Sequence, residues 1–428
     1  MERFSELLVQ LCSYVPPSRS VTLCMSRDFP KLYNFFLGER RSRAVSRIML
    51  PMQSSMDLNI PVLKSGCSPE SGYNVFPTEP VYIDGFADQI VVLNSLQKPK
   101  KITLRGSDGR IYSVMCKAKD DLRLDKRLME FNGLVNICLL RSAEARKRQL
   151  CIRTYTVVPL SEDCGLVEWV SNLEGLRHIM VKIYKERGSV MTMKELQNTA
   201  PRKSDPLSKK QKIFEDVLLK RHPAVLSFWF RSSFPDPSTW YRARLNYIRT
   251  GAVMSMVGFV LGLGDRHGEN ILIDSVTGEV VHVDFNCLFN KGEDLDWPEL
   301  VPFRLTHNMV DAMGPLGYEG PFRRCCEVTM RVMRKQNSML RSALETFLHD
   351  PLVEWTRNST KPRPTAGEEK AKEHLLNIDT RLKGSIKAKL DAPYGLPLNV
   401  EGQVNHLIQQ ATDKKLLCQM YIGWAAYM

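Results

Sequence analysis

Three oxygen-bearing side chains lie close together in one stretch of the sequence, and together they could handle a phosphoryl group. Asp265 precedes Asn270 by five residues, and Asp284 follows the segment 271–285 at its end. That segment consists of two β-branched, apolar runs around a Ser-Val-Thr-Gly turn, which predicts a hairpin that brings Asn270 beside Asp284. One carboxylate could orient an attacking hydroxyl, while the amide oxygen and the second carboxylate bind magnesium, or manganese, on nucleotide phosphates. The spacing therefore predicts ATP-dependent phosphoryl transfer.

The order of residues around Asp265 separates two kinds of kinase. In the catalytic loop of ordinary protein kinases a histidine precedes the aspartate, whereas here His267 follows it in the stretch GDRHGEN. This order, with VDF after the hairpin, resembles the phosphoinositide-kinase superfamily, which contains lipid kinases and large protein kinases. For any single residue a loop that merely satisfies its turns is the better interpretation, but the whole set favours the catalytic one.

A second group of candidate residues lies nearer the N-terminus, where strand-forming runs dominate from residue 81 to 155. The turn 106–109 joins two of these runs, and Lys117 ends the returning strand. Lys117 could reach phosphates held under the turn, with Ser107 and nearby backbone amides covering them. Such a turn is often purely structural, and a single strand lysine is often only solvated. The order of these features along the chain favours the functional interpretation.

A lysine that grips phosphates needs a carboxylate to fix its ammonium group, and kinases supply it from the next helix. A helical pattern follows Lys117 from residue 121 onward. We expect Asp125 to be the partner, and Asp120 and Glu130 are the alternatives.

The adenine ring of ATP needs apolar walls beside a hinge between two lobes. Residues 165–170 leave the strand-rich region and enter a helical one, so we expect the hinge there. Trp169 and Val170 would then lie along one side of the ring, with Tyr155 at the back. Leu272 and Val283 of the hairpin would form the floor. Considered alone, Trp169 could equally be a core aromatic.

Local patterns predict the elements that must position these residues. The apolar run 252–263 is too short to span a bilayer and leads into the catalytic loop, which predicts a buried helix. Helical spacing recurs in residues 1–50, 172–260, 307–349 and 373–390, and few hydrophobic residues occur from 356 to about 370, as in a linker. The strand predictions are 81–83, 90–93, 102–105, 111–117, 152–158, 271–274 and 279–285.

Bulk composition bounds the class of protein. The 428 residues are 43% hydrophobic and 25% charged, which is ordinary globular composition. The N-terminus lacks the basic region of a signal peptide, and eleven cysteines without CxxC spacing suggest reduced thiols in the cytosol or nucleus rather than zinc sites. The net charge of +13 favours polyanionic partners, although it also suits nucleotide binding.

The C-terminal residues narrow the resemblance. The ending IGWAAYM is similar to the FATC segment of the phosphoinositide-kinase-related protein kinases, which lipid kinases lack, and stretches such as PFRLTHNMVDAMGP and FLHDPLVEW resemble the DNA-damage checkpoint branch of that family. The resemblance implies an α+β, two-lobed phosphoinositide-kinase-like protein kinase fold with flanking helices and a C-terminal FATC segment. It also implies that a long helical-repeat part is missing here. The implied divisions are 1–55 (end of a FAT-type helical region), 56–80 (connection), 81–164 (N-lobe), 165–171 (hinge), 172–350 (C-lobe), 351–395 (regulatory linker and helix) and 396–428 (FATC).

Residue roles are also implied by the resemblance. Asp265 would be the catalytic base or orienter, His267 a transition-state stabiliser, and Asn270 and Asp284 the metal ligands. Asn286 stands where the family usually has the glycine of DFG, which removes backbone flexibility but keeps the metal ligand. Implied substrates carry Ser or Thr followed by Gln. Implied partners are an ATRIP-type adaptor and activators acting on residues 351–395, in the nucleus, with DNA contacted through partners and no membrane.

The segment after Asp284 bears on the choice between protein and lipid substrates. From Phe285 to Pro302 it contains one cation, Lys291, against four acidic residues: Glu293, Asp294, Asp296 and Glu299. A phosphoinositide headgroup calls for clustered Lys or Arg, so we expect a protein hydroxyl as the acceptor. Arg304, just beyond, could anchor the loop or meet the substrate. We expect the apolar C-terminus to pack beside this loop. The family resemblance implies a small pocket for Gln between this loop and the C-terminal segment.

Overall fold

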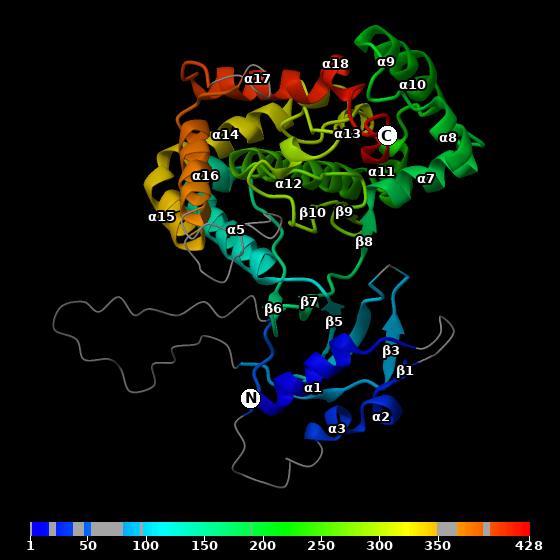
Figure 1. The fold of residues 1–428 in the computed structure, drawn as a ribbon, viewed down its shortest axis with the longest axis vertical. Coiled ribbons are helices and arrows are strands. Elements are labelled where there is room, and N and C mark those ends of the chain that lie inside the picture. The colour runs from blue at the N-terminus through cyan, green and yellow to red at the C-terminus, as the bar shows by residue number, and fades with distance from the viewer. Residues whose placement is uncertain are drawn as a thin grey trace, which may run out of the picture. The chain divides into compact units, whose positions relative to one another are not determined.

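The computed structural model describes residues 2–16, 23–36, 47–52, 80–94, 97–189, 191–348, 366–387 and 394–428. The chain forms two compact units (Figure 1). Unit 1 contains Met1–Met129 and Tyr155–Val170, and unit 2 contains Glu130–Thr154 and Ser171–Met428. The expected connection 56–80 lies outside the described residues except for its last position.

Unit 1 is built on an antiparallel sheet. In the described residues the strand order is β1-β3-β4-β5-β7-β6, and β2 pairs with β4. The central hairpin is formed by β4 and β5, whose register pairs Arg105 with Ile111 and Lys100 with Cys116. The strands are β1 (Leu23–Cys24), β2 (Ile83–Phe86), β3 (Gln89–Val92), β4 (Lys100–Gly106), β5 (Ile111–Ala118), β6 (Val157–Pro159) and β7 (Cys164–Glu168).

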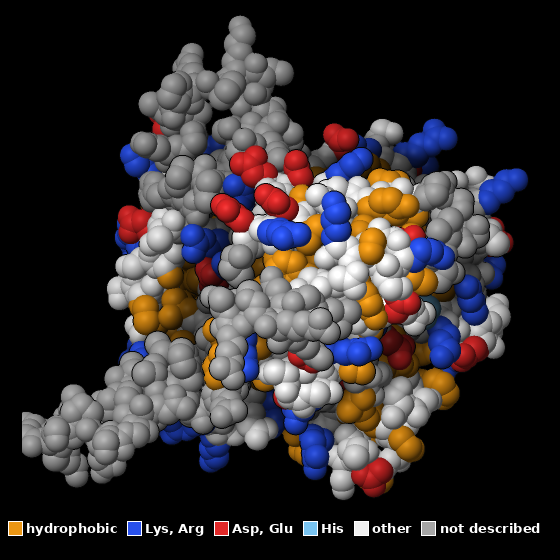
Figure 2. All heavy atoms as spheres, turned by 90° about the horizontal axis from the view of Figure 1, so that it is seen from below, with side chains coloured by type: hydrophobic (Ala, Val, Ile, Leu, Met, Phe, Trp, Pro, Cys, Tyr) orange, Lys and Arg blue, Asp and Glu red, His pale blue; other side chains and the backbone are white. Residues whose placement is uncertain are grey.

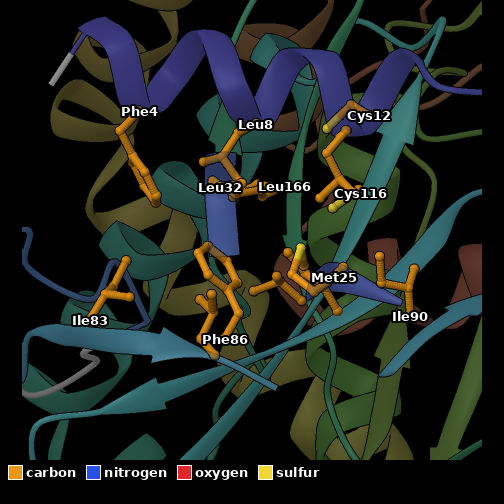
Figure 3. Close-up of a cluster of buried hydrophobic side chains, with 14 of the residues drawn as sticks. Phe4, Leu8, Cys12, Met25, Leu32, Ile83, Phe86, Ile90, Cys116 and Leu166 are labelled. Atoms are coloured by element: carbon orange, nitrogen blue, oxygen red, sulfur yellow. The ribbon is translucent and has the colours of Figure 1, made fainter. Parts of the chain in front are cut away.

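Short helices complete the core of unit 1. They are α1 (Glu2–Ser13), α2 (Met25–Asp28) and α3 (Pro30–Tyr33). Phe4, Leu8 and Cys12 lie on one face of α1 and point toward the sheet, where Cys116 and Leu166 are buried (Figure 3). The helical spacing in the first residues therefore reflects packing onto this sheet.

One strand prediction in unit 1 needs correction. Residues 165–168, within the expected hinge 165–171, belong to β7, which pairs with β5 along its whole length, and the hinge itself stays a prediction. The strand expected over 152–158 begins only at Val157. The backbone of Ile152 instead exchanges two hydrogen bonds with the side chain of Asn136. Ile152 therefore pairs with a side chain of another segment and not with a neighbouring strand.

Unit 2 is mainly helical, with a small antiparallel sheet of order β10-β9-β8. Its strands are β8 (Leu173–Gly175), β9 (Ile271–Asp274) and β10 (Val280–His282). Helix α5 (Arg123–Arg141) starts in unit 1 and continues into unit 2. The other helices are α6 (Ala143–Lys147), α7 (Leu176–Glu186), α8 (Met193–Thr199), α9 (Leu207–Ile213), α10 (Leu219–Arg221), α11 (Leu226–Ser233), α12 (Pro237–Leu261), α13 (His307–Ala312), α14 (Pro321–Lys335), α15 (Asn337–Leu348), α16 (Ala366–Leu382), α17 (Val400–Thr412) and α18 (Lys414–Leu417), with short 3-10 turns at Lys291–Asp294, Gly317–Glu319 and Ile422–Trp424 and a π-turn at Phe214–Leu218.

Helix α12 is the central helix of unit 2 (Figure 1). It leads directly into the loop 262–270 that contains Asp265, which we call the catalytic loop. Its N-terminus is capped by Asp236, whose side chain accepts the Thr239 N–H, and Pro237 occupies the first turn. Every residue from Ala252 to Leu261 is buried, which confirms the predicted buried helix. Gly262, with φ of 65°, ends the helix in a left-handed conformation that a glycine adopts without strain.

The remaining helices predicted for unit 2 are present, but their first and last residues differ from the predicted ones. Helix α16 runs from Ala366 to Leu382, earlier than the predicted 373–390, and most of the expected linker lies outside the described residues. The terminal Trp424–Met428 is buried, as expected.

Within the described part of the chain, no helix combines the length and apolarity needed to cross a membrane. On the face seen in Figure 2, Lys and Arg side chains are spread among acidic and hydrophobic ones.

Candidate active site

The backbone around Asp265 is fixed by polar contacts on both of its sides. Asp265 has a φ of 57°, which is unusual for a residue with a side chain. Its N–H donates to Glu299 Oε2 at 2.9 Å, and its carbonyl accepts from Asn270 Nδ2 at 2.9 Å. The Asp265 side chain is 46% exposed, so its carboxylate is available to a substrate.

Arg266 holds the catalytic loop against the end of the hairpin, a role that sequence reasoning missed. Its Nε donates to the Gly264 carbonyl and its Nη1 to the Val283 carbonyl, both at 2.9 Å, and Nη2 donates to the carbonyl of Asp284. Arg266 is buried, and burial lowers its pKa while the carboxylates of Asp284, Asp265 and Glu299 oppose that shift. The sequence gives no local signal for this role, because the partners are backbone carbonyls.

The hairpin brings the two predicted metal ligands together. Strands β9 and β10 pair in the register Ile271 with His282, and the Val283 N–H donates to the Asn270 carbonyl at 3.1 Å. Asn270 therefore lies beside Val283, one residue before Asp284. The second strand ends at His282, so the predicted strand to residue 285 is too long.

The donor set at this point suits a hard cation. The amide nitrogen of Asn270 donates to the Asp265 carbonyl, and among the described residues its amide oxygen accepts no hydrogen bond. Asp284 has a φ of 59°, and its Oδ1 accepts from Asn286 Nδ2 at 2.9 Å, which leaves Oδ2 for a metal. Carboxylate and amide oxygens fit Mg²⁺ or Mn²⁺. Asn286 thus orients the ligand that precedes it, where the family pattern has a glycine.

His267 lies on the same loop as Asp265. Its Nε2 is 4.0 Å from Asp265 Oδ1, and its Nδ1 is 3.2 Å from the Glu269 N–H. Because Nδ1 accepts a hydrogen bond from the Glu269 N–H, the proton of the neutral ring lies on Nε2. Nε2 can therefore donate to a group near Asp265. Its role as a transition-state stabiliser stays a prediction.

Unit 1 places the predicted phosphate-binding residues on the central hairpin and the start of α5. The Tyr82 N–H donates to Ser107 Oγ at 3.0 Å, which fixes the turn. Lys117 Nζ lies 3.0 Å from Asp120 Oδ2, so one of the alternative carboxylates is a partner in this structure. Asp125 is 5% exposed in the first turn of α5. Its pairing with Lys117 stays a prediction.

The predicted adenine-binding residues occur in both units. In unit 1, Tyr155 is buried, and Trp169 and Val170 are half-buried after β7; Lys101 Nζ lies 4.5 Å from the Trp169 ring centre. In unit 2, Leu272 and Val283 are half-buried on the hairpin. Adenine binding by these residues stays a prediction.

Arg304 anchors the C-terminal segment, which settles the alternative left open by the sequence. Its Nη1 donates to the Trp424 carbonyl at 2.6 Å, and its Nη2 to the carbonyls of Ala425 and Met428 at 2.8 and 3.1 Å. The guanidinium also lies 4.4 Å from the Trp424 ring centre. Burial lowers the pKa of Arg304 to about 9. Because Arg304 is 2% exposed, it cannot meet a substrate.

A cavity of about 230 Å³ lies where the catalytic loop, the segment after Asp284 and the C-terminal segment meet. We name it the peptide cavity. It lies where the family resemblance implies a small pocket between the loop and the C-terminal segment. It is lined by Arg177, Asp265, His267, Glu269, Leu295, Trp297, Glu299, Met420, Tyr421, Gly423 and Trp424.

Comparison with known proteins places this site in a family. Residues 111–357 match the family model for phosphatidylinositol 3- and 4-kinase, and residues 397–428 match the FATC domain. The chain is 44% identical to protein kinase rad3 of Schizosaccharomyces pombe over 99% of its own length and 17% of rad3. It is 46% identical to serine/threonine-protein kinase ATR of Drosophila melanogaster over 90% of its own length and 15% of that kinase. It therefore spans less than a fifth of these relatives.

Solved structures agree with the sequence matches. The FAT and kinase domain of CtTel1 superposes with a TM-score of 0.80 at 32% identity, over all of this chain and 28% of that one. The kinase-family match covers more than half of the chain, and the FATC match covers its end. The chain therefore belongs to the phosphatidylinositol 3- and 4-kinase family, in the branch of phosphoinositide-kinase-related protein kinases that includes ATR and rad3.

Proposed function

We propose that this chain is the catalytic part of a serine/threonine protein kinase of the DNA-damage and replication-stress checkpoint, which phosphorylates Ser or Thr followed by Gln. The observation that carries the proposal is the peptide cavity, because it joins the proposed catalytic Asp265 and His267 to the FATC residues Tyr421 and Trp424. The relatives are named as serine/threonine-protein kinase ATR and protein kinase rad3, which supports it.

The roles of the residues follow from their placement. Asp265, held by Glu299 and Asn270, orients the substrate hydroxyl and receives its proton. His267 Nε2 donates to the transferring phosphoryl oxygens. Asn270 and Asp284 would hold the metal, which when bound neutralises developing charge on the phosphates. ATP binding is assigned to Ser107, Lys117, Asp125 or Asp120, Tyr155, Trp169, Val170, Leu272 and Val283.

The charges of the peptide cavity favour a protein over an inositol lipid. Its single cation among the lining residues, Arg177, lies 3.8 Å from Glu269. Asp265, Glu269 and Glu299 give the wall a net negative charge. A phosphoinositide headgroup needs clustered cations, so lipid kinase activity, the alternative within the family, is disfavoured.

Two buried polar atoms at the cavity support Gln after the phosphorylated residue. Glu299 Oε1 and Trp424 Nε1 are buried and, within the described residues, make no hydrogen bond of regular geometry. Burial raises the pKa of the Glu299 carboxyl, and the Trp424 side chain is nevertheless close enough to oppose that rise by hydrogen bonding. One is an acceptor and the other a donor, and a carboxamide offers the complementary donor and acceptor. Leu295, Trp297 and Met420 supply apolar contacts for the methylene groups of a Gln side chain.

A catalytically inactive scaffold is the rival from another functional class. A scaffold would have no need for the strained Asp265 or for two free metal-binding oxygens. ATP turnover by the purified protein would exclude the scaffold, and loss of that turnover in Asp265→Asn would assign it to this site.

The cellular context is proposed on the relatives alone. We assign the protein to the nucleus, with an ATRIP-type adaptor, activators that act on residues 351–395, and DNA contacted through these partners rather than directly. The net charge of +13 fits polyanionic partners.

A peptide and lipid panel tests the proposed substrate. The wild-type protein should phosphorylate Ser-Gln and Thr-Gln peptides about tenfold or more faster than peptides with another residue after the acceptor, and should not phosphorylate phosphoinositide vesicles. Asp265→Asn is the control for contaminating kinases. Strong turnover on vesicles, or no preference for Gln, would refute the assignment.

A further inference from the structure

We infer that Glu299 is a positioning residue that couples recognition of the residue after the phosphorylated Ser or Thr to the turnover rate. The inference rests on the proposed function, because it assumes that the peptide cavity holds that residue. It goes further by stating that the discrimination appears in kcat and that one carboxylate causes it.

The first support is the contact between Glu299 and the catalytic loop. Glu299 Oε2 accepts the N–H of Asp265 at 2.9 Å. Asp265 has a left-handed backbone, with φ of 57°, and such a conformation persists only where the surroundings hold it. A charge-assisted hydrogen bond is among the stronger ways to hold it. The Glu299 carboxylate therefore helps to set the direction of the Asp265 side chain.

The second support comes from two glycines in different loops. A Cβ atom on Gly264 or on Gly292 would each come within 2.7 Å of Glu299 Oε2. The Glu299 N–H donates to the Gly292 carbonyl at 2.9 Å, and the Gly264 N–H donates to the Cys287 carbonyl at 2.7 Å. Both loops thus leave space for the same carboxylate oxygen. Neither glycine has a positive φ angle. Glu299 is the nearest neighbour of both Cβ positions, and at Gly264 the Cys287 sulfur, at 2.9 Å, adds to the crowding.

The third support is the unequal use of the two carboxylate oxygens. Oε2 accepts the Asp265 N–H, whereas Oε1 is buried and makes no hydrogen bond of regular geometry in the described structure. Glu299 lines the peptide cavity together with Asp265 and Trp424. Burial raises the pKa of Glu299, and hydrogen bonding by the Asp265 N–H and by the nearby Trp424 side chain opposes that rise. A substrate carboxamide that donates to Oε1 would fix the rotation of the carboxylate and keep Oε2 on Asp265.

This arrangement predicts which kinetic constant depends on Gln. A contact that only binds the substrate changes KM, whereas a contact that aligns the catalytic residue changes kcat. Because the same carboxylate touches the cavity and the Asp265 N–H, Gln should raise kcat and not only lower KM. A substrate without the carboxamide would bind but leave Asp265 less well aligned.

The test compares the full-length wild-type protein with Glu299→Ala, Glu299→Gln and Asp294→Ala. Asp294 is the matched control, since it is an exposed acidic residue of the same segment that does not line the cavity. Steady-state kinetics are measured on a Ser-Gln peptide and on the same peptide with Met in place of Gln. In the wild type and in Asp294→Ala, kcat should be about tenfold higher with Gln, which corresponds to one hydrogen bond.

The two Glu299 variants separate positioning from a general structural role. Glu299→Ala should lower kcat on the Ser-Gln peptide about tenfold or more, leave the KM for ATP unchanged and abolish the kcat preference for Gln. Glu299→Gln keeps an oxygen for the Asp265 N–H, so its kcat should recover relative to Glu299→Ala, with a weaker preference. Thermal melting shows that each variant is folded, and Glu299→Gln carries the test alone if Glu299→Ala unfolds.

Two results would overturn the inference: a wild-type preference for Gln confined to KM, or an unchanged kcat in Glu299→Ala. If the wild type phosphorylates no Ser-Gln peptide, the proposed substrate fails separately. In that case ATP hydrolysis without peptide, which also uses Asp265, tests the contact between Glu299 and the Asp265 N–H. It should fall in Glu299→Ala and not in Asp294→Ala, and equal hydrolysis in both would reject the positioning role.

Discussion

Asp265 and Asp284 both have left-handed backbone conformations, with φ of 57° and 59°, although neither is a glycine. Each such residue costs about 1–3 kcal/mol, so the surrounding contacts must hold them. Glu299 and Asn270 hold Asp265, while Arg266 and Asn286 hold Asp284. The strain lowers the stability of the loop, and these contacts fix the backbone from which both carboxylates project.

Neutralising Asp265 and neutralising Asp284 should have different effects on turnover and on ATP binding. Asp265→Asn removes the group proposed to orient the hydroxyl and should lower kcat by about 10²–10⁴ with nearly unchanged ATP affinity. Asp284→Asn removes a proposed metal ligand and should weaken magnesium-ATP binding as well. Nucleotide binding is measured by competition with a fluorescent analogue, with Asp294→Ala as a control. An equal loss of ATP affinity in both variants would contradict this division of roles.

At the scale of elements, the structure shows which features a single sequence can predict. The hairpin of β9 and β10 and the buried part of α12 were predictable, because alternation, turn composition and a long apolar run are local signals. The contacts of Arg266 and Glu299 were not, because their partners are backbone groups supplied by tertiary contacts. For Arg304 the sequence left anchoring and substrate contact as alternatives, and its backbone partners in the C-terminal segment could not be named. The end of β10 and the extent of β7 depend on the neighbouring strands, which local composition does not reveal.

The turn that ends α12 gives an element-scale prediction. Gly262 has a φ of 65°, and a Cβ there would collide with the Asn290 side chain and lie 2.7 Å from its backbone nitrogen. Gly262→Ala should therefore destabilise the protein by about 1–3 kcal/mol and lower its melting temperature. Gly133→Ala is the matched control, because Gly133 lies in α5 with no atom within 4 Å of its Cβ. That change should be neutral or stabilising by up to about 1 kcal/mol. Equal melting temperatures for the two variants would refute the argument.

At the scale of the whole molecule, the C-terminal segment is part of the core of unit 2. Trp424–Met428 is buried, and Arg304 reaches it from the segment that follows Asp284. Trp297 and Tyr421 add a ring contact with centroids 6.1 Å apart. The C-terminus, the segment that follows Asp284 and the peptide cavity are therefore one packed region, so stability and activity should be lost together when this region is disrupted.

Removal of residues from Tyr421 onward tests that coupling. The truncation leaves the buried Arg304 guanidinium without its three carbonyl partners, and an uncompensated buried charge typically costs about 3–5 kcal/mol. It also opens one wall of the peptide cavity. We expect a clear drop in melting temperature and loss of peptide phosphorylation. Tyr427→Phe is the control, because the Tyr427 hydroxyl is buried without a hydrogen-bond partner in the described structure, and its removal should leave both properties unchanged. A truncated protein with wild-type melting temperature and activity would show that the C-terminal segment does not hold the loop.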